Sequence, residues 1–252
     1  MLADAFFEGV VKMKSALTYF TKVERMLLFS SVILVILSFC IFDRENYMTL
    51  AASLIGVVSL IFSAKGNPIG QLLMVVFSLL YGIMSFTFAY YGEMITYLGM
   101  TMPMAIFALI SWLRNPYNGN KAEVKVNRIG AKEIGFMWIM AVLVTGLFYF
   151  ILRYFHTANL VPSTLSVTTS FLAVYLTFRR SPYFAVAYAA NDVVLILLWI
   201  LASLEDRRYV SVVVCFVAFF VNDIYGFLNW KKMEKRQRLL HMRQQNTDFC
   251  ET

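Results

Sequence analysis

Hydrophobic residues occur in eight long runs separated by short polar segments. The runs cover residues 26–42, 48–64, 69–91, 94–113, 134–152, 160–178, 183–204 and 209–230. Each is close to the 17–25 residues, as a rough range, that a helix needs to cross a bilayer. Backbone polar groups must be paired within lipid, so all eight are predicted to be helices. The third and fourth runs are separated only by Gly92-Glu93, which we interpret as a turn.

Composition supports a lipid environment and excludes several classes of protein. The chain is 60% hydrophobic and 15% charged, whereas soluble domains are roughly 45–50% apolar and about 25% charged. Most soluble enzymes, disordered proteins and nucleic-acid-binding proteins are therefore excluded. The three cysteines are scattered, and no spacing typical of metal ligands, ATP binding or hydrolase chemistry occurs. We expect an all-α integral membrane protein with no cofactor, no metal and no catalytic residue.

The distribution of positive charge predicts the orientation. With the N-terminus placed in the cytoplasm, 18 of the 22 Lys and Arg residues fall on the cytoplasmic side and four on the other. Such an imbalance is typical of cytoplasmic loops. Both termini are therefore predicted to be cytoplasmic, and the net charge of +7 needs no nucleic-acid partner.

The segments outside the runs have distinct patterns. Residues 1–25 are predicted to contain an amphipathic helix lying on the inner membrane surface, although a plain soluble extension remains an alternative. Residues 114–152 hold a polar arm and a connecting helix, and Asn118-Gly119 favours a small hairpin in the arm. Residues 231–252 form a basic cytoplasmic tail, best explained as a solvated orientation signal.

Two parts of the chain have a similar layout. Gly66-Asn67-Pro68 and Arg180-Ser181-Pro182 each precede a long apolar run, and the next run ends at Trp112 or Trp230 beside basic residues. Residues 48–113 and 160–230 would then be parallel three-helix repeats joined by the helix at 134–152. The helix at 26–42 would lie outside this core. Coincidence is the alternative explanation.

Two carboxylates lie inside predicted helices, each preceded by an asparagine: Asn191-Asp192 and Asn222-Asp223. A charge at the centre of a spanning helix costs about 2.5–3.5 kcal/mol on insertion scales. No Lys or Arg is predicted at that depth, so each acid must face water, hold a proton or meet a ligand. We interpret the pairs as lining a substrate path between the repeats, with a structural role in tying helices together as the alternative.

Polar and aromatic residues at helical spacing extend this path. Amides and carboxylates can bind hydroxyls or a carboxamide, and aromatic rings can enclose a flat, cationic ring. Ser and Thr more often bond to backbone or neighbouring helices, so single hydroxyls are weaker candidates. The predicted substrate-binding residues are Asn191, Asp192, Tyr188, Trp199, Asn222, Asp223, Gln71, Ser78, Tyr81, Thr101 and Thr168.

The sequence resembles the PnuC family of bacterial vitamin transporters over roughly residues 45–235. The resemblance is carried by Gly66-Asn67-Pro68, by Tyr81-Gly82, by Trp112 with Arg114, by Asn191-Asp192 and by the segment from Asn222 to Trp230. It implies a 3+1+3 core like that of the SWEET sugar transporters, plus an extra N-terminal helix, in the bacterial inner membrane. It also implies facilitated diffusion of nicotinamide riboside, with trapping by a cytoplasmic kinase.

Several alternatives stay open at this point. Relatives are thought to carry thiamine or riboflavin, and transport could be coupled to protons through Asp192 or Asp223. A membrane-embedded enzyme is a remote alternative. The sequence leaves the oligomeric state open, including a homo-oligomer.

Overall fold

The computed structural model describes residues 19–88, 90–157 and 159–250. The amphipathic pattern expected in residues 1–25 therefore falls mostly outside the described residues. Eight helical segments in the described part are long and apolar enough to cross a membrane, as predicted. Seven are the helices α2 (Lys22–Phe42), α3 (Tyr47–Ala64), α4 (Ile69–Thr87), α7 (Ala131–Tyr154), α8 (Leu160–Phe178), α9 (Phe184–Ser203) and α10 (Val210–Cys250). The eighth comprises α5 (Tyr91–Thr96), the π-helical segment η1 (Tyr97–Thr101) and α6 (Met102–Leu113).

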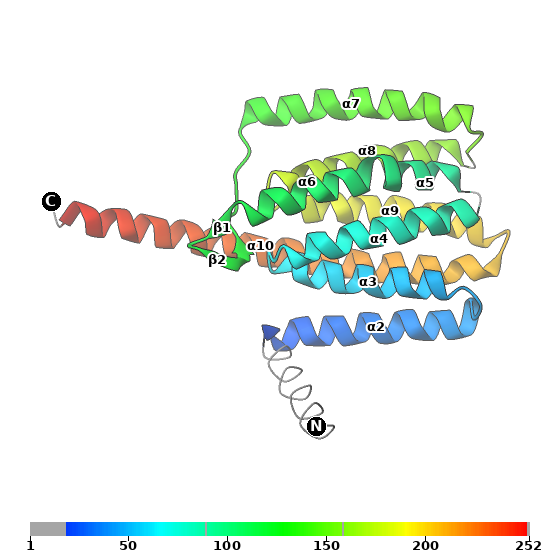
Figure 1. Cartoon of the computed structure of the whole chain (residues 1–252), viewed down its shortest axis with the longest axis horizontal. Helices are drawn as coiled ribbons and strands as arrows, with labels where there is room; N and C mark the ends of the chain where they lie inside the picture. Colours follow the sequence, from blue (N-terminus) through cyan, green and yellow to red (C-terminus); the bar gives the residue numbers. More distant parts are fainter. Residues whose placement is uncertain (1–18, 89, 158, 251–252) are drawn as a thin grey trace, which may run out of the picture.

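The helices lie side by side along the long axis of the molecule (Figure 1). Six segments contact one another in a closed order: α3 packs on α4, α4 on α6, α6 on α8, α8 on α9, α9 on α10, and α10 on α3. Helix α7 lies at one edge and packs mainly against α8, while α2 lies at the opposite edge against α3 and α10. The first helix of each predicted repeat therefore contacts the last helix of the other.

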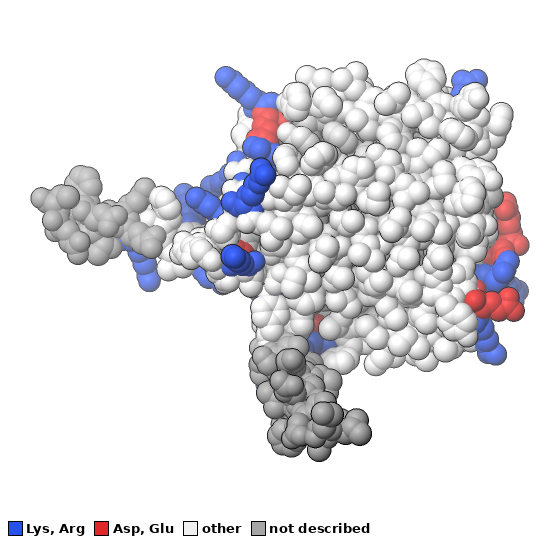
Figure 2. Space-filling model, viewed as in Figure 1, with Lys and Arg blue, Asp and Glu red and all other residues white. Residues whose placement is uncertain are grey.

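Charged side chains are concentrated at the two ends of the molecule and leave an uncharged belt between them (Figure 2). Lys and Arg gather at the end where the hairpin and the extension of α10 lie, whereas the other end carries both signs. Large hydrophobic side chains are exposed along the belt, including Ile139, Val142 and Phe150 of α7. Such a belt is stable only against lipid or an equally apolar surface.

The turn expected at Gly92-Glu93 is wrong. Helix α4 ends at Thr87, the Tyr90 N–H donates to the carbonyl of Ser85, and α5 begins at Tyr91. Glu93 thus lies inside a helix and is only 1% exposed. Gly92 lets α5 approach the α7–α8 connection closely, since a Cβ there would collide with the Thr157 side chain. Glu93 is buried because α5 packs against α4 and α8.

The π-helical segment has a local cause. The Met102 N–H donates to the carbonyl of Tyr97, five residues back. Pro103 follows at once and has no N–H with which to continue the regular helix. The helix therefore has a widened turn directly before Pro103, a feature that is frequent at functional sites.

The predicted hairpin is confirmed. Strands β1 (Pro116–Tyr117) and β2 (Asn120–Val124) pair in antiparallel fashion around Asn118 and Gly119, both of which have positive φ. Such a two-residue turn matches the twist of a hairpin.

Helix α10 does not end at the membrane but continues through the predicted tail, where it holds the hairpin. Glu123 pairs with Arg236 and accepts a hydrogen bond from Gln237 at 2.8 Å. The Gln237 side chain in turn accepts from the N–H of Val126 at 2.9 Å. The cytoplasmic arm is therefore an ordered part of the fold.

Two buried tryptophans hold the ring of helices together at the end where the hairpin lies. The Trp112 indole N–H of α6 donates to the carbonyl of Thr177 in α8 at 2.9 Å. The Trp230 indole N–H of α10 donates to the carbonyl of Ser63 in α3 at 2.8 Å. Both side chains are fully buried, and their ring centroids lie 5.4 Å apart. The two contacts are equivalent in the two predicted repeats.

Trp230→Phe should destabilise the protein, because it removes an interhelical hydrogen bond and leaves a gap in a packed cluster. We expect a loss of about 1–3 kcal/mol in the free energy of unfolding. The measurement is the fraction of detergent-solubilised protein that still elutes as the native peak after heating over a range of temperatures. Trp138→Phe is the control, since Trp138 is 52% exposed on α7; equal losses in both variants would contradict this account.

Candidate functional site

The centre of the helix ring contains acidic side chains that are shielded from solvent. Asp192 of α9 and Asp223 of α10 are 3% and 4% exposed, and their carboxyl groups interact directly with each other. Two carboxylates cannot bond to each other without a proton between them, because both would be acceptors only. The second oxygen of Asp192 has no hydrogen-bond partner among the described residues. The predicted acids thus meet between α9 and α10, and one acceptor is left free.

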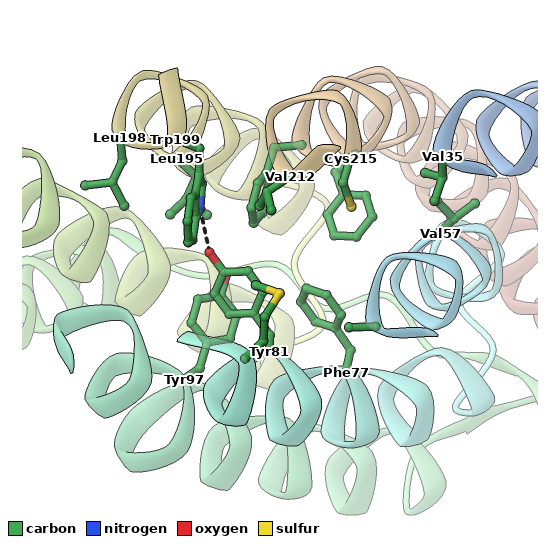
Figure 3. Close-up of a cluster of buried hydrophobic side chains, with 14 of the residues drawn as sticks. Val35, Val57, Phe77, Tyr81, Tyr97, Leu195, Leu198, Trp199, Val212 and Cys215 are labelled. Carbon is green, nitrogen blue, oxygen red and sulfur yellow. Dashed lines mark hydrogen bonds between the residues drawn. The ribbon is translucent and has the colours of Figure 1, made fainter. Parts of the chain in front are cut away.

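An aromatic wall adjoins the acids. The Trp199 indole N–H donates to the Tyr81 hydroxyl at 2.7 Å, and the Tyr81 and Tyr97 ring centroids lie 4.3 Å apart. Figure 3 shows Tyr81 and Tyr97 reaching from one side of the cluster toward Trp199 on α9. All three side chains are buried. The hydrogen bond to Tyr81 fixes the orientation of the Trp199 ring. The rings of Tyr81, Tyr97 and Trp199 therefore form a stable aromatic surface in the interior.

The outer end of this wall is closed by another tyrosine. The Tyr90 ring centroid lies 4.9 Å from that of Trp199. Burial, with a smaller effect of the nearby Glu205 charge, raises the pKa of Tyr90 to about 12. Its phenol therefore stays neutral and adds apolar surface to the wall at physiological pH.

The two asparagines that precede the acids point in different directions. The Asn191 side-chain oxygen accepts hydrogen bonds from Thr169 and Ser170, at 2.8 and 3.0 Å, and so links α9 to α8. The Asn222 side-chain nitrogen donates to Ser31 of α2 at 2.9 Å and to the carbonyl of Ala218. Both asparagines hold helices together here, and their contact with substrate stays a prediction.

Other predicted residues divide between the centre and the helix contacts. Gln71 donates to Ser63 between α4 and α3, and Thr168 shares a hydrogen bond with Thr145 between α8 and α7. Thr168 also borders a surface groove on α7, away from the acids. Tyr188 contacts Thr177 and lies near both aspartates.

Several hydroxyl groups in the helix ring are buried without a partner. The side-chain oxygens of Ser78, Thr101 and Ser166 form no hydrogen bond within the part of the chain that the structure describes. They come from α4, η1 and α8, three of the segments that form the ring. Unpaired polar atoms cost free energy unless water or a ligand satisfies them. The ring of helices therefore has binding capacity that its own side chains do not use.

Sequence reasoning missed Glu93, which it assigned to a turn. Glu93 is buried, and both of its carboxyl oxygens are unpartnered among the described residues. The available signal was the absence of any Lys or Arg between residues 66 and 113. A glutamate in such a stretch has no base nearby in sequence, which favours a functional role for a membrane acid.

The charged residues at the centre of the helix ring are all acidic. The segments 66–113, 181–206 and 209–230 contain no Lys or Arg, yet they supply Glu93, Asp192 and Asp223. Together with aromatic surfaces, such acids attract a cation and repel an anion. The arrangement can therefore bind a flat, positively charged molecule that also carries hydroxyl or amide groups.

Replacing Asp192 tests whether the acids depend on each other. Asp192→Asn should keep near-normal stability, because a carboxamide N–H can donate to Asp223 in place of the shared proton. Asp192→Leu should lose about 1–3 kcal/mol, because the buried Asp223 loses its partner. Melting temperatures of the two purified variants in the same detergent make the comparison. Equal destabilisation by Asn and Leu would contradict a direct carboxyl–carboxyl contact.

Comparisons with known proteins agree with this architecture. Over 202 residues the chain is 24% identical to a protein of Neisseria mucosa named nicotinamide riboside transporter PnuC, covering 78% of this chain and 76% of that protein. The crystal structure of the vitamin B3 transporter PnuC superposes with a TM-score of 0.76 at 22% identity, covering 86% of this chain and 94% of that one. This similarity confirms the fold.

A family described as nicotinamide mononucleotide transporter matches residues 46–232. Because that match spans well over half of the sequence, the chain belongs to this family of membrane transporters, the PnuC family.

Proposed function

We propose that this protein carries nicotinamide riboside across the membrane by facilitated diffusion. The observation that carries the proposal is an interior with buried acids, aromatic surfaces and unpaired hydroxyl groups but no base. Nicotinamide riboside offers a cationic pyridinium ring, a carboxamide and a ribose. The acids suit its charge, the aromatic rings its flat face, and the amides and hydroxyls its polar groups.

The same electrostatics argue against two related molecules. A mononucleotide adds a phosphate with up to two negative charges, which Glu93, Asp192 and Asp223 would repel with no Lys or Arg at hand to compensate. Riboflavin is uncharged and gains nothing from the acids. Thiamine is cationic, so it is the closest alternative on charge alone, although it has no ribose.

The proposed mechanism is alternating access between two three-helix units, 48–113 and 160–230, in a 3+1+3 core with one extra N-terminal helix. The equivalent contacts of Trp112 and Trp230 at the ends of α8 and α3 support this division. Since each tryptophan bridges the two units at the cytoplasmic end, that end acts as a hinge or gate. Facilitated diffusion only equalises concentrations, so net uptake requires trapping, which we assign to a cytoplasmic kinase that phosphorylates the riboside.

The proposed location is the bacterial inner membrane, with both termini in the cytoplasm. The excess of Lys and Arg at one end of the molecule supports this orientation (Figure 2). Fusion of a green fluorescent protein to the C-terminus should give fluorescent cells, and fusion of alkaline phosphatase should give an inactive phosphatase. The reverse pattern would overturn the orientation.

Binding and uptake test the substrate. Purified protein should bind nicotinamide riboside at least about tenfold, that is 1.4 kcal/mol, more tightly than nicotinamide mononucleotide, thiamine or riboflavin. Liposomes that contain the protein should equilibrate labelled riboside, and protein-free liposomes should not. Tighter binding of thiamine would change the substrate, and tighter binding of the mononucleotide would contradict the charge argument.

Proton coupling is a second candidate, because Asp192 and Asp223 interact directly and a contact between two carboxyl groups requires a proton on one of them. Under facilitated diffusion, the final ratio of riboside across liposomes should stay the same with and without an imposed pH gradient. Accumulation above equilibrium in the presence of the gradient would establish coupling instead.

A further inference from the structure

Among the acids of the interior, Glu93 is the one whose charge is offset least by neighbouring groups. Its side chain is 1% exposed, and neither carboxyl oxygen has a hydrogen-bond partner in the described ranges. Asp192 and Asp223 differ, because they interact with each other. A carboxylate kept from water and from any base needs a counter-charge, either a proton or a bound cation.

The surroundings of Glu93 are those of a cation site. Ser166 of α8 lies beside it, and its hydroxyl is the one side-chain donor in the described chain that interacts with the Glu93 carboxyl group. Tyr81 and Tyr97 are close enough for its charge to act on them. Tyr81 is in turn fixed by the Trp199 indole N–H. An acid next to stacked aromatic faces is the combination that binds flat organic cations.

Glu93 also lies next to an irregular part of its helix. It lies in the six-residue helix α5, not far before the π-helical segment η1 that precedes Pro103. The regular hydrogen-bond pattern is interrupted in η1, a feature that is frequent at functional sites. Because α5 follows the outer end of α4, Glu93 occupies the outer half of the interior.

We propose that Glu93 determines specificity for a positively charged ring, by placing its carboxylate beside the wall formed by Tyr81, Tyr97 and Trp199. This inference rests on the proposed function and identifies which acid recognises the cation. A carboxyl group that only holds helices together has hydrogen-bond partners for its oxygens, as the amide groups of Asn191 and Asn222 do. Among the described residues the Glu93 carboxyl group interacts at most with the single Ser166 hydroxyl, so at least one of its oxygens has no protein partner.

The test compares two ligands that differ in charge. Nicotinamide riboside and its reduced 1,4-dihydro form share the ribose and the carboxamide, but the ring of the reduced form is neutral. Affinities of the full-length protein for both are measured by calorimetry for wild type, Glu93→Gln and Glu205→Gln. The last variant removes an exposed acid at the same end of the molecule and serves as the control.

In Glu93→Gln, affinity for the cationic riboside should fall about 10- to 100-fold, the range of a charge-assisted contact. Affinity for the reduced riboside should change by less than about twofold, which also shows that the variant is folded. Glu205→Gln should bind both ligands as wild type does.

Two results would overturn the role of Glu93 while leaving the proposed function intact: unchanged binding of the cationic riboside in Glu93→Gln, or equal weakening of both ligands. The second result would make Glu93 a structural residue. Failure of the wild-type protein to bind the riboside would instead refute the proposed function, and this inference with it.

Discussion

The absence of water in the hydrocarbon layer is the constraint on which this structure depends. Every polar group within that layer must find a partner in the protein or in a ligand. The indole N–H groups of Trp112 and Trp230 meet carbonyls at the ends of α8 and α3. Asn191 and Asn222 join neighbouring helices in the same way. Polar contacts thus fix the relative positions of helices whose surfaces are otherwise uniformly apolar.

Some buried polar groups of the helix ring lack a partner. Glu93, Ser78, Thr101, Ser166 and one oxygen of Asp192 are buried without partners in the described residues. They come from α4, α5, η1, α8 and α9, five of the segments that contribute to the ring of helices. Because buried polar groups in folded proteins seldom lack a partner, these side chains can bind a polar ligand or water.

The end of the molecule that carries the hairpin is more highly organised than its charge suggests. Helix α10 passes out of the membrane and holds the hairpin arm through Gln237 and Arg236. The N–H of Asn127 in the same arm donates to the carbonyl of Arg180 in the α8–α9 connection. The arm therefore joins elements from both halves of the chain. The basic arm thus also packs near the contacts of Trp112 and Trp230.

The sequence by itself determined the number of spanning helices, the hairpin and the resemblance to a transporter family, because hydrophobic length, turn residues and charge are local properties. It also pointed to Asp192 and Asp223, since an acid within an apolar run is conspicuous. Only the tertiary structure decided that Glu93 is buried, that Asn191 and Asn222 face neighbouring helices, and that Trp199 bonds to Tyr81. Those outcomes depend on the rotation of each helix about its own axis. That rotation is set by packing between segments far apart in the chain, and hydropathy does not encode it.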